Sequence, residues 1–257
     1  MINASDQYYS ILCDELHSHL LNTPLTHADE TPFEVIADGR KPGRSSYMWV
    51  YRTGACDPDH PVVIYDYQPT RRTDHPEEFL KDYNGILMTD GYQVYHSLEK
   101  KRKGLQIAGC WVHAKRGFAT LVKAAGSEQA EGIIAAEASR RISNLFHLDK
   151  KWKDLSTLLF LSNGVIPMDN NLAEQAIRPF TLGRKNWVNI FSEHGAEASS
   201  VLYSIVETAK ANQLRVFDYL EYTLDQLVKH ADDTDRTFLQ DLLPWSDYVQ
   251  EHFHSPK

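Results

Sequence analysis

The chain has 257 residues, of which 42% are hydrophobic and 24% are charged, and its formal net charge is −8. This length suits one sizeable domain or two small ones, and the composition is typical of a folded globular protein rather than a disordered or fibrous one. The longest apolar runs are far too short to span a bilayer, and the first residues lack the basic and apolar stretches of an export signal.

The first part of the chain predicts one helix followed by three strands. Apolar residues recur at helical intervals over Tyr8–Leu21. Runs rich in β-branched and aromatic residues, separated by turn residues, then predict strands at Leu25–Ile36, Ser46–Thr53 and Pro61–Tyr67. The short connections between these three strands favour antiparallel neighbours.

The pattern changes after the third strand. Acidic residues and Pro76 near the start of His75–Tyr83 predict a helix. A short apolar strand, Gly85–Thr89, and a further strand, Leu105–Val112, follow it. This order of elements, after three antiparallel strands, predicts an α/β fold with a mixed sheet flanked by helices.

Helical periodicity dominates from Ala114 onwards. We expect helices around Phe118–Val122, over Glu131–Asp149, over Leu172–Ile177, over Ala196–Asn212 and over Phe217–His230. The acidic and aromatic tail from Asp232 is expected to dock loosely or to fray.

The three cysteines, Cys13, Cys56 and Cys110, are scattered and form no Cys-x-x-Cys pair. This arrangement favours reduced thiols in a cytoplasmic protein over a zinc knuckle or a disulfide framework.

Three acidic residues stand where a mixed sheet would bring them together. Asp29 lies on the first predicted strand, Asp90 ends the fourth, and Glu174 lies in the first turns of a later helix. The first and fourth strands of such a sheet can be neighbours, and a helix across their ends would add Glu174. Converging carboxylates repel one another unless a cation is bound, and oxygen ligands favour Mg²⁺ or Mn²⁺. Two such ions would support an in-line displacement at phosphorus.

Each of these residues also has a plain structural interpretation. Asp90-Gly91 suits a turn, and Asn171 with Glu174 has the spacing of a capping box. Asp29 alone could be any acid at a strand end. His27, two residues before Asp29, is either a metal neighbour or a structural histidine with its hydrogen bonds satisfied.

The sequence around the three acids contains several longer motifs. In chain order they are His27-Ala-Asp29-Glu-Thr31-Pro, Met88-Thr-Asp90-Gly-Tyr92, Cys110-Trp-Val-His113-Ala-Lys115-Arg116, Asp169-Asn-Asn-Leu-Ala-Glu174-Gln-Ala-Ile-Arg178-Pro-Phe-Thr-Leu-Gly-Arg184-Lys185-Asn186-Trp187 and Leu202-Tyr-Ser-Ile-Val-Glu207-Thr-Ala-Lys-Ala-Asn212. Together they resemble transposases of the insertion sequence 66 family, over most of the chain from about Leu25 to about Leu227.

The resemblance implies a ribonuclease-H-like fold and a DDE triad on Asp29, Asp90 and Glu174. These acids would bind Mg²⁺ or Mn²⁺, two ions in all, and catalyse DNA cleavage and strand transfer. Transposases of this chemistry generally act as dimers or larger assemblies on paired DNA ends, so a homo-oligomer is also expected.

Basic residues cluster in these motifs although the net charge is negative. A protein that binds phosphates needs Lys and Arg where the DNA backbone runs, so their positions matter more than the total charge. The candidates for DNA binding are Arg178, Arg184, Lys185, Trp187, His113, Lys115 and Arg116. A solvated surface is the plain alternative for each basic cluster, and a lone Trp is more often a core residue than a base-stacking one.

The chain departs from the family pattern in two places. Only residues 1–24 precede the first motif, where family members carry a long region with a DNA-binding module and a zinc cluster. The stretch between Arg116 and Asp169 is short, as though a helical pair were missing. We therefore expect an N-terminal helical remnant (1–24), a catalytic core in two parts (25–118 and 166–212), a shortened helical insertion (119–165) and a C-terminal helical segment (213–257).

The sequence thus predicts the catalytic domain of a DDE transposase that acts on transposon ends and target DNA, in the cytoplasm and without a membrane. Two alternatives stay open. One is a truncated, non-catalytic remnant that binds DNA or a full-length transposase. The other is a plain ribonuclease-H-like nuclease, which would explain the acids but not the longer motifs.

Overall fold

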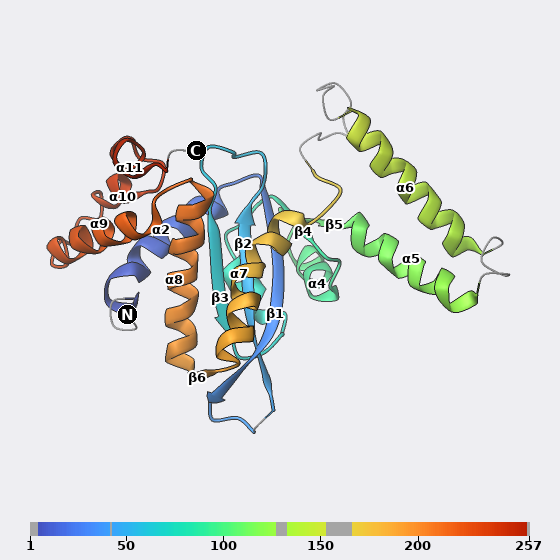
Figure 1. Cartoon of the computed structure of the whole chain (residues 1–257), viewed down its shortest axis with the longest axis horizontal. Helices are drawn as coiled ribbons and strands as arrows, with labels where there is room; N and C mark the ends of the chain where they lie inside the picture. Colours follow the sequence, from blue (N-terminus) through green and yellow to red (C-terminus); the bar gives the residue numbers. More distant parts are fainter. Residues whose placement is uncertain (1–4, 42, 127–132, 153–165, 256–257) are drawn as a thin grey trace.

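A six-stranded mixed sheet forms the centre of the computed structural model, which describes residues 5–41, 43–126, 133–152 and 166–255. The antiparallel half consists of β1 (Leu25–Ala37), β2 (Ser45–Thr53) and β3 (Val63–Gln68). Two short parallel strands, β4 (Ile86–Thr89) and β5 (Gln106–Gly109), extend it on the other side of β1, in the order β3-β2-β1-β4-β5 (Figure 1). This arrangement confirms the predicted mixed sheet and is that of a ribonuclease-H-like fold.

The strand β1 is central, with β2 antiparallel on one side and β4 parallel on the other. Its first half, Thr26–Ala28, is fully buried because both faces of the sheet are covered there. Further along, exposed and buried residues alternate, because one face of the strand turns to solvent. The three-residue strand β6 (Ile190–Ser192) pairs with this outer end of β1.

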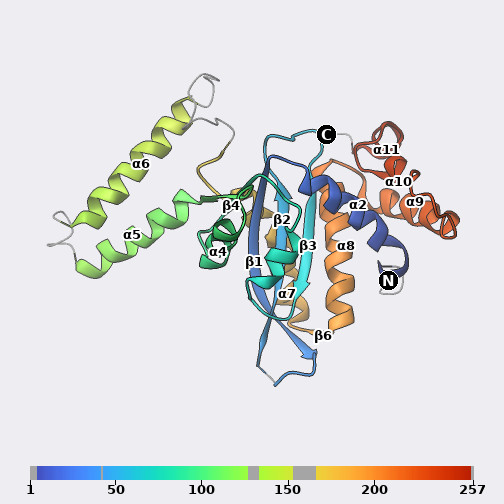
Figure 2. The same ribbon diagram turned by 180° about the vertical axis from the view of Figure 1, so that it is seen from behind.

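Successive residues of β2 point to opposite faces of the sheet and enter two different cores. Met48 and Val50 pack with α7 (Asn171–Trp187) on one face (Figure 1). Trp49 and Tyr51 pack on the other face with α2 (Ser10–Leu21) and α4 (Gln93–Lys101), which Figure 2 shows from behind. The helix α3 (Asp74–Phe79) adds Phe79, whose ring stacks on Tyr51 at 3.9 Å.

The free edge of the sheet is covered by α8 (Glu193–Ala211), which runs along β3. Ser204 Oγ accepts a hydrogen bond from Tyr65 N (2.8 Å). Thr208 Oγ1 accepts one from Val63 N (2.9 Å) and donates one to Val63 O (3.0 Å). These hydroxyls satisfy backbone groups that a sheet edge otherwise leaves open to another chain.

The C-terminal region packs firmly, which corrects our expectation that the tail from Asp232 docks loosely or frays. It consists of α9 (Val216–Lys229), α10 (Leu239–Leu242) and α11 (Asp247–Phe253). The apolar residues Leu239, Leu242, Leu243 and Val249 are all buried in the core that contains α2. Arg215 N also donates to Phe253 O at 2.7 Å, which ties the end of α11 to the start of α9.

Helices α5 (Trp111–Ala125) and α6 (Ile134–Trp152) pack against each other and project away from the sheet (Figure 1, Figure 2). Every residue of α5 keeps a partly or fully exposed side chain, whereas Ala135 and Ile142 of α6 are buried. The predicted insertion 119–165 includes residues 127–132 and 153–165, which lie outside the described residues.

Several predicted boundaries are wrong, and each has a local cause. The predicted strand Leu105–Val112 ends at Gly109, because Trp111 already begins α5. The predicted helix Leu172–Ile177 continues through Pro179 to Trp187. The helix α4 and the strand β6 were not predicted, α4 because its end lies in a run of charged residues, Lys100–Lys103, that suggests a solvated loop.

Within the described part of the chain, no helix combines the length and apolar character needed to cross a membrane.

Candidate active site

The sheet register puts Asp29 and Asp90 on neighbouring segments of the chain. The last paired positions of the parallel strands are His27 on β1 and Met88 on β4. Asp29 lies two residues beyond His27, and Asp90 lies two residues beyond Met88 at the end of β4. Because side chains alternate along strands, the two carboxylates leave neighbouring strands on the same face of the sheet. The prediction that the first and fourth strands are neighbours is therefore confirmed.

Asp90 also forms the turn that its sequence suggests. Its Oδ1 accepts a hydrogen bond from Tyr92 N (2.8 Å), and Gly91 has a φ of 90°. This positive φ suits glycine because it has no Cβ. The turn directs the chain from β4 into α4, so the structural and the functional interpretations of Asp90-Gly91 are compatible.

A buried asparagine attaches the helix that carries Glu174 to the strand that carries Asp29. Asn170, just before α7, is fully buried, and its Oδ1 lies 2.9 Å from His27 Nδ1. Its Nδ2 donates to Ala28 O at 2.8 Å. Glu174 N donates to Asn170 O (3.1 Å) in the first turn of α7, so Glu174 starts close to this anchor.

The capping-box prediction for Asn171 and Glu174 is wrong. The helix begins at Asn171, so Asn170 is the residue that precedes it, and its side chain binds β1 instead of capping the helix. Asp169 Oδ1 accepts from Asn171 N at 3.1 Å and partly takes the capping role. The Glu174 carboxylate therefore does not cap the start of α7.

Glu174 instead faces His113 and Cys110. His113 Nδ1 lies 3.7 Å from Glu174 Oε1, too far for a hydrogen bond. Both atoms are buried and have no hydrogen-bond partner among the described residues. With Cys110 Sγ they form a group of three ligand atoms that all lie within 4.8 Å of one another. Buried polar atoms usually have a hydrogen-bond partner. The two unpartnered atoms therefore indicate a binding position for an ion or a further polar group.

The electrostatics of the site are those of crowded carboxylates. Burial, and then the neighbouring charges of Glu30, Asp90 and Glu174, together raise the pKa of Asp29 from 3.8 to about 7, against one hydrogen bond from Glu30 N. The charges of Asp90 and Glu174 thus both act on Asp29. They are more widely spaced than the Cys110 group, since they do not form a set of ligand atoms within 4.8 Å.

Sequence reasoning missed an ion pair beside these acids. The Glu30 side chain is 2% exposed and pairs with the Arg71 guanidinium, whose Nε donates to Oε1 at 2.7 Å. Tyr95 Oη donates to Glu30 Oε2 at 3.1 Å. Burial raises the pKa of Glu30, and the bonds from Arg71 oppose that rise. Arg71 also lies over the Tyr92 ring, 3.7 Å from its centroid.

His27, for which we left two interpretations open, is fully buried beneath Asp29. Its Nδ1 is held by Asn170, which favours the structural role, while Nε2 has no partner among the described residues. Burial lowers the pKa of His27, so the ring is held neutral.

The residues predicted to bind DNA lie on two helices, and the first group is on α7. Arg178 and Lys185 are exposed, and they follow Glu174 at intervals of four and eleven residues, which places them along one side of the helix. Arg184 is tied to β1, where its guanidinium donates to Thr31 Oγ1 (3.2 Å) and to Pro32 O.

Trp187 packs edge-to-face on Phe180, with ring centroids 5.3 Å apart, in the core between α7 and the sheet. This is the core role that we considered the more frequent one for a lone Trp.

The second basic group lies at the start of α5. His113, Lys115 and Arg116 are in its first two turns, with Arg116 exposed and Lys115 half-buried. The Trp111 N–H donates to Met168 O at 2.9 Å, which fixes the start of α5 beside the segment that leads into α7. The two basic groups thus begin at the same end of the sheet as the acids.

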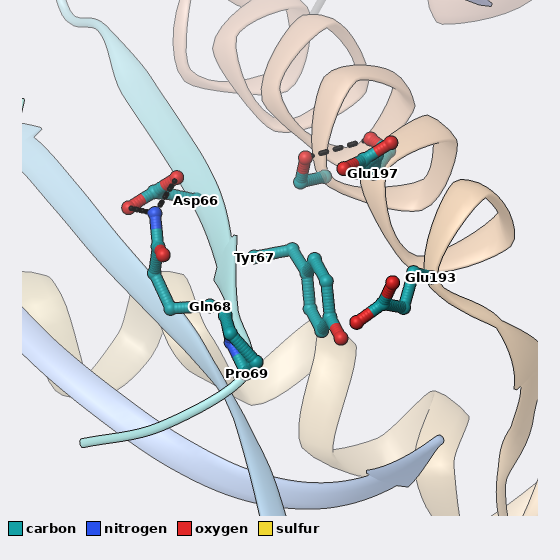
Figure 3. Close-up of a pocket in the computed structure, with 7 residues that line it drawn as sticks. Asp66, Tyr67, Gln68, Pro69, Glu193 and Glu197 are labelled. Carbon is teal, nitrogen blue, oxygen red and sulfur yellow. Dashed lines mark hydrogen bonds between the residues drawn. The ribbon is translucent and has the colours of Figure 1, made fainter. Parts of the chain in front are cut away.

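A separate hollow lies between β3 and the start of α8 (Figure 3). It has a volume of about 380 Å³ and is lined by Asp66, Glu193 and Glu197 among others. An acidic lining repels phosphate, and the hollow is on the edge strand rather than beside Asp29. It is therefore not part of the candidate site.

Two models of known families match the chain. The model of the family described as "Transposase IS66 family" matches residues 1–158 and 149–198, and that of the "IS66 C-terminal element" matches residues 204–245. The chain belongs to the IS66 transposase family. This family match covers all three candidate acids of the IS66 chain. Asp29 and Asp90 lie in its first segment, and Glu174 lies in its second.

The curated relatives are longer than this IS66 chain. It is 26% identical to the "Uncharacterized protein y4qI" of Sinorhizobium fredii over 92% of the chain and 53% of the relative. It is also 26% identical to y4jD and y4hP of the same organism, over 91% and 90% of the chain and 56% and 52% of the relatives. The chain therefore spans about half the length of the curated relatives it matches.

Proposed function

We propose that this chain is the catalytic region of a DDE transposase, which cleaves DNA at the ends of an insertion sequence and joins the 3′-hydroxyl to target DNA. Asp29, Asp90 and Glu174 are the proposed metal ligands and catalytic residues. The proposal is supported by the register of β1 and β4, whose last paired residues, His27 and Met88, each precede one of the acids by two positions, and by the Asn170 contacts that attach the start of α7 to β1. Membership of the IS66 family supports it.

The donor set fits hard divalent cations. Three carboxylates supply oxygen ligands of the type that Mg²⁺ and Mn²⁺ prefer. Glu174 Oε1 is buried without a partner, and the pKa of Asp29 is raised by burial and by neighbouring acids. Both features describe a site whose negative charge is not balanced by the protein itself. Two bound ions would activate the attacking hydroxyl and stabilise the leaving oxygen at phosphorus.

The chain's own residues position these ligands. Asn170 holds the start of α7 against β1, and His27 supports Asn170 from below. Arg71 forms an ion pair with Glu30. The Glu30 carboxylate, next to Asp29 in the sequence, is therefore not available as a ligand of the cation. Such positioning and electrostatic support are the main contributions that a protein makes to phosphoryl transfer.

DNA would run across the exposed basic side chains along α7 and at the start of α5. Arg178 and Lys185 of α7 and Lys115 and Arg116 of α5 are the proposed phosphate contacts. Arginine offers forked contacts to a phosphate, and lysine a point charge. Arg184 and Trp187 are omitted, because their side chains already bind β1 and the core.

We further propose that the protein works as a homo-oligomer in the cytoplasm, because joining two DNA ends in one event needs two catalytic centres. Exposed apolar side chains where β1 pairs with β6 support self-association, and they are Ile36, Val188 and Phe191. Isolated exposed apolar residues are common, but a group of this kind is typical of an interface.

A strand-transfer assay tests the proposal. The substrate is DNA carrying the terminal repeats that flank the coding region, with Mg²⁺ or Mn²⁺ present. We expect joined products from the wild-type chain and none from Glu174→Gln, while Asp66→Asn, outside the site, remains active. Binding without any cleavage would identify a non-catalytic remnant, and cleavage that ignores the terminal repeats would identify a plain nuclease.

A further inference from the structure

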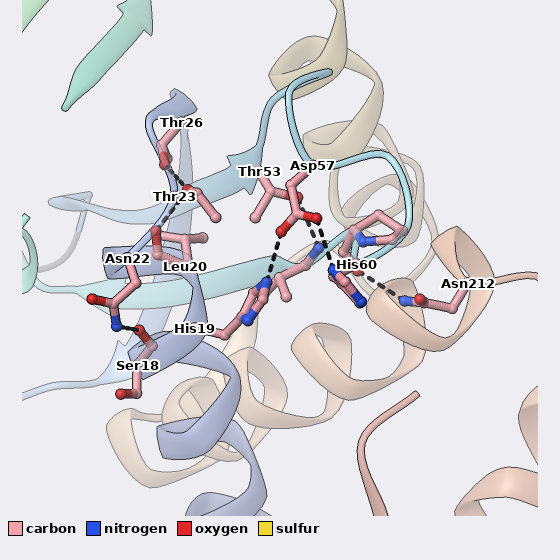
Figure 4. A network of polar contacts seen from close by, with 12 residues as sticks. Ser18, His19, Leu20, Asn22, Thr23, Thr26, Thr53, Asp57, His60 and Asn212 are labelled. Carbon is pink, nitrogen blue, oxygen red and sulfur yellow. Dashed lines mark hydrogen bonds and ion pairs between the residues drawn. The ribbon is translucent and has the colours of Figure 1, made fainter. Parts of the chain in front are cut away.

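A second group of ligand side chains lies where α2 meets the loop between β2 and β3. His19 is in the last turn of α2, and Asp57 and His60 are in the loop. The Asp57 carboxylate stands between the two imidazoles (Figure 4). His19 Nε2 lies 2.8 Å from Asp57 Oδ2, and His60 Nδ1 lies 2.9 Å from Asp57 Oδ1. The three ligand atoms all lie within 4.8 Å of one another.

We propose that His19, Asp57 and His60 bind a transition-metal ion, for which Zn²⁺ is the best match. Two imidazole nitrogens and one carboxylate oxygen form a donor set that Zn²⁺ accepts, whereas Mg²⁺ and Ca²⁺ prefer oxygen alone. Zn–N and Zn–O bonds of about 2.0–2.1 Å put the ligand atoms of a tetrahedral ion about 3.3 Å apart. Small side-chain movements would bring the three ligand atoms, now all within 4.8 Å of one another, to this spacing. The side chains of His19, Asp57 and His60 are 29%, 19% and 42% exposed, which leaves a coordination position open to water.

The loop that carries two of the ligands is fixed at both ends. Gly54 N donates to Leu25 O at 2.9 Å, and Thr53 N donates to Val62 O at 3.1 Å. From α8, the Asn212 side chain donates to Pro61 O at 2.8 Å. The backbone around Asp57 and His60 is therefore held independently of the histidines, which reduces the conformational entropy that ion binding would cost.

The imidazoles themselves are held by a tryptophan from the C-terminal region. The Trp245 ring lies 4.6 Å from the His19 ring and 5.1 Å from the His60 ring, centroid to centroid. Trp245 lies between α10 and α11, so the group joins three parts of the chain. A bound ion would connect α2 directly to the loop between β2 and β3, beside Trp245.

A simple pair of Asp and His is the competing explanation, and the chain contains one for comparison. His230 Nδ1 lies 2.7 Å from Asp233 Oδ2 on the surface, and no third ligand joins this pair among the described residues. At Asp57, in contrast, two imidazoles from separate segments converge on one carboxylate. A bound ion requires several ligands to converge on one point, whereas a simple Asp–His pair does not.

The test is a Zn²⁺ titration of the whole chain by calorimetry, carried out in an Asp90→Asn/Glu174→Gln background. This background removes Glu174 from the Cys110–His113–Glu174 group, the other three-ligand cluster among the described residues, and it also disables the proposed Asp29–Asp90–Glu174 centre, which Zn²⁺ would otherwise occupy. His60→Gln and Asp57→Asn are the test variants, and His230→Gln is the matched control. Circular dichroism and the metal-free Tm verify the fold of each, and Asp57→Asn keeps the size and one acceptor oxygen of the native residue.

We expect the background protein to bind one Zn²⁺ and to gain roughly 5–10 °C in Tm at a hundredfold excess over Kd. Each test variant should weaken binding by about 100-fold or more, since loss of a ligand costs at least as much as loss of its supporting contacts. His230→Gln should bind as the background does. Zn²⁺ binding that survives in both folded test variants, or its absence in the background protein, would overturn the proposal. Neither result bears on Mg²⁺-dependent strand transfer, whose ligands are different residues.

Discussion

Replacing Asp29 with Asn should stabilise the metal-free protein while it removes the metal site. Burial and neighbouring acids raise the pKa of Asp29 from 3.8 to about 7. Each pKa unit corresponds to about 1.4 kcal/mol, so ionising Asp29 in the folded state costs up to about 4 kcal/mol. Asp29 keeps part of its surface exposed, and solvent screening reduces the expected gain to about 1–3 kcal/mol.

The sign of the pH dependence follows from the raised pKa. The protonated carboxyl contributes its full stability below the unfolded-state pKa of 3.8, and this contribution is lost as the pH rises through about 7. The difference in unfolding free energy between Asp29→Asn and wild type should therefore be near zero at about pH 4 and largest above pH 7.

Urea unfolding in the presence of a chelator, at pH 5 and at pH 8, measures this difference. Asp66→Asn is the matched control, because burial also raises the pKa of Asp66 to about 7. It should show a similar stabilisation but leave metal binding intact. An Asp29→Asn protein that is less stable than wild type at pH 8, or that differs from it equally at both pH values, would refute the electrostatic reasoning.

Three further predictions concern residues around the acids. Arg71→Ala leaves the Glu30 carboxylate unpaired and should lower the unfolding free energy by about 1–3 kcal/mol at pH 8, and by less at pH 5, where Glu30 can take up a proton. Asn170→Ala removes two buried hydrogen bonds and should cost about 1–3 kcal/mol in urea unfolding and also reduce strand transfer. Arg178→Ala and Lys185→Ala should each lower the salt dependence of DNA binding by about one unit of slope in a fluorescence titration, with stability within about 0.5 kcal/mol of wild type.

Each of these expectations has a contrary outcome. Equal effects of Arg71→Ala at both pH values would show that the Glu30 charge is not the cause. Full strand transfer by a destabilised Asn170→Ala protein would separate the anchor from catalysis. An unchanged salt slope in Arg178→Ala and Lys185→Ala would place the DNA elsewhere.

The sequence predicted those features of the fold that local patterns encode. Runs rich in β-branched and aromatic residues identified the antiparallel strands, and the order of elements allowed the first and fourth strands to be neighbours, as they are in the structure. The helix α4 was missed because its end runs into the charged residues Lys100–Lys103, although Val94, Tyr95 and Leu98 have helical spacing and are buried.

The supporting contacts of the site could not be predicted in the same way. Asn170 binds His27, 143 positions earlier in the chain, and Arg71 pairs with Glu30 across 41 positions. No local pattern encodes such contacts, since they exist only once the helix and the strand have packed. The spacing of Asn171 and Glu174 favoured a capping box, but the tertiary contact of Asn170 with β1 decided where α7 begins.

A Mn²⁺ titration followed by electron paramagnetic resonance tests the central claim most directly. The samples are the wild-type chain, Asp90→Asn and the control Asp66→Asn, at pH 8, where Asp29 is ionised. We expect Mn²⁺ to bind to wild type and to Asp66→Asn, and binding to be lost in Asp90→Asn. Equal binding by all three proteins, or no binding by any of them, would contradict the assignment of Asp29, Asp90 and Glu174 as a metal centre.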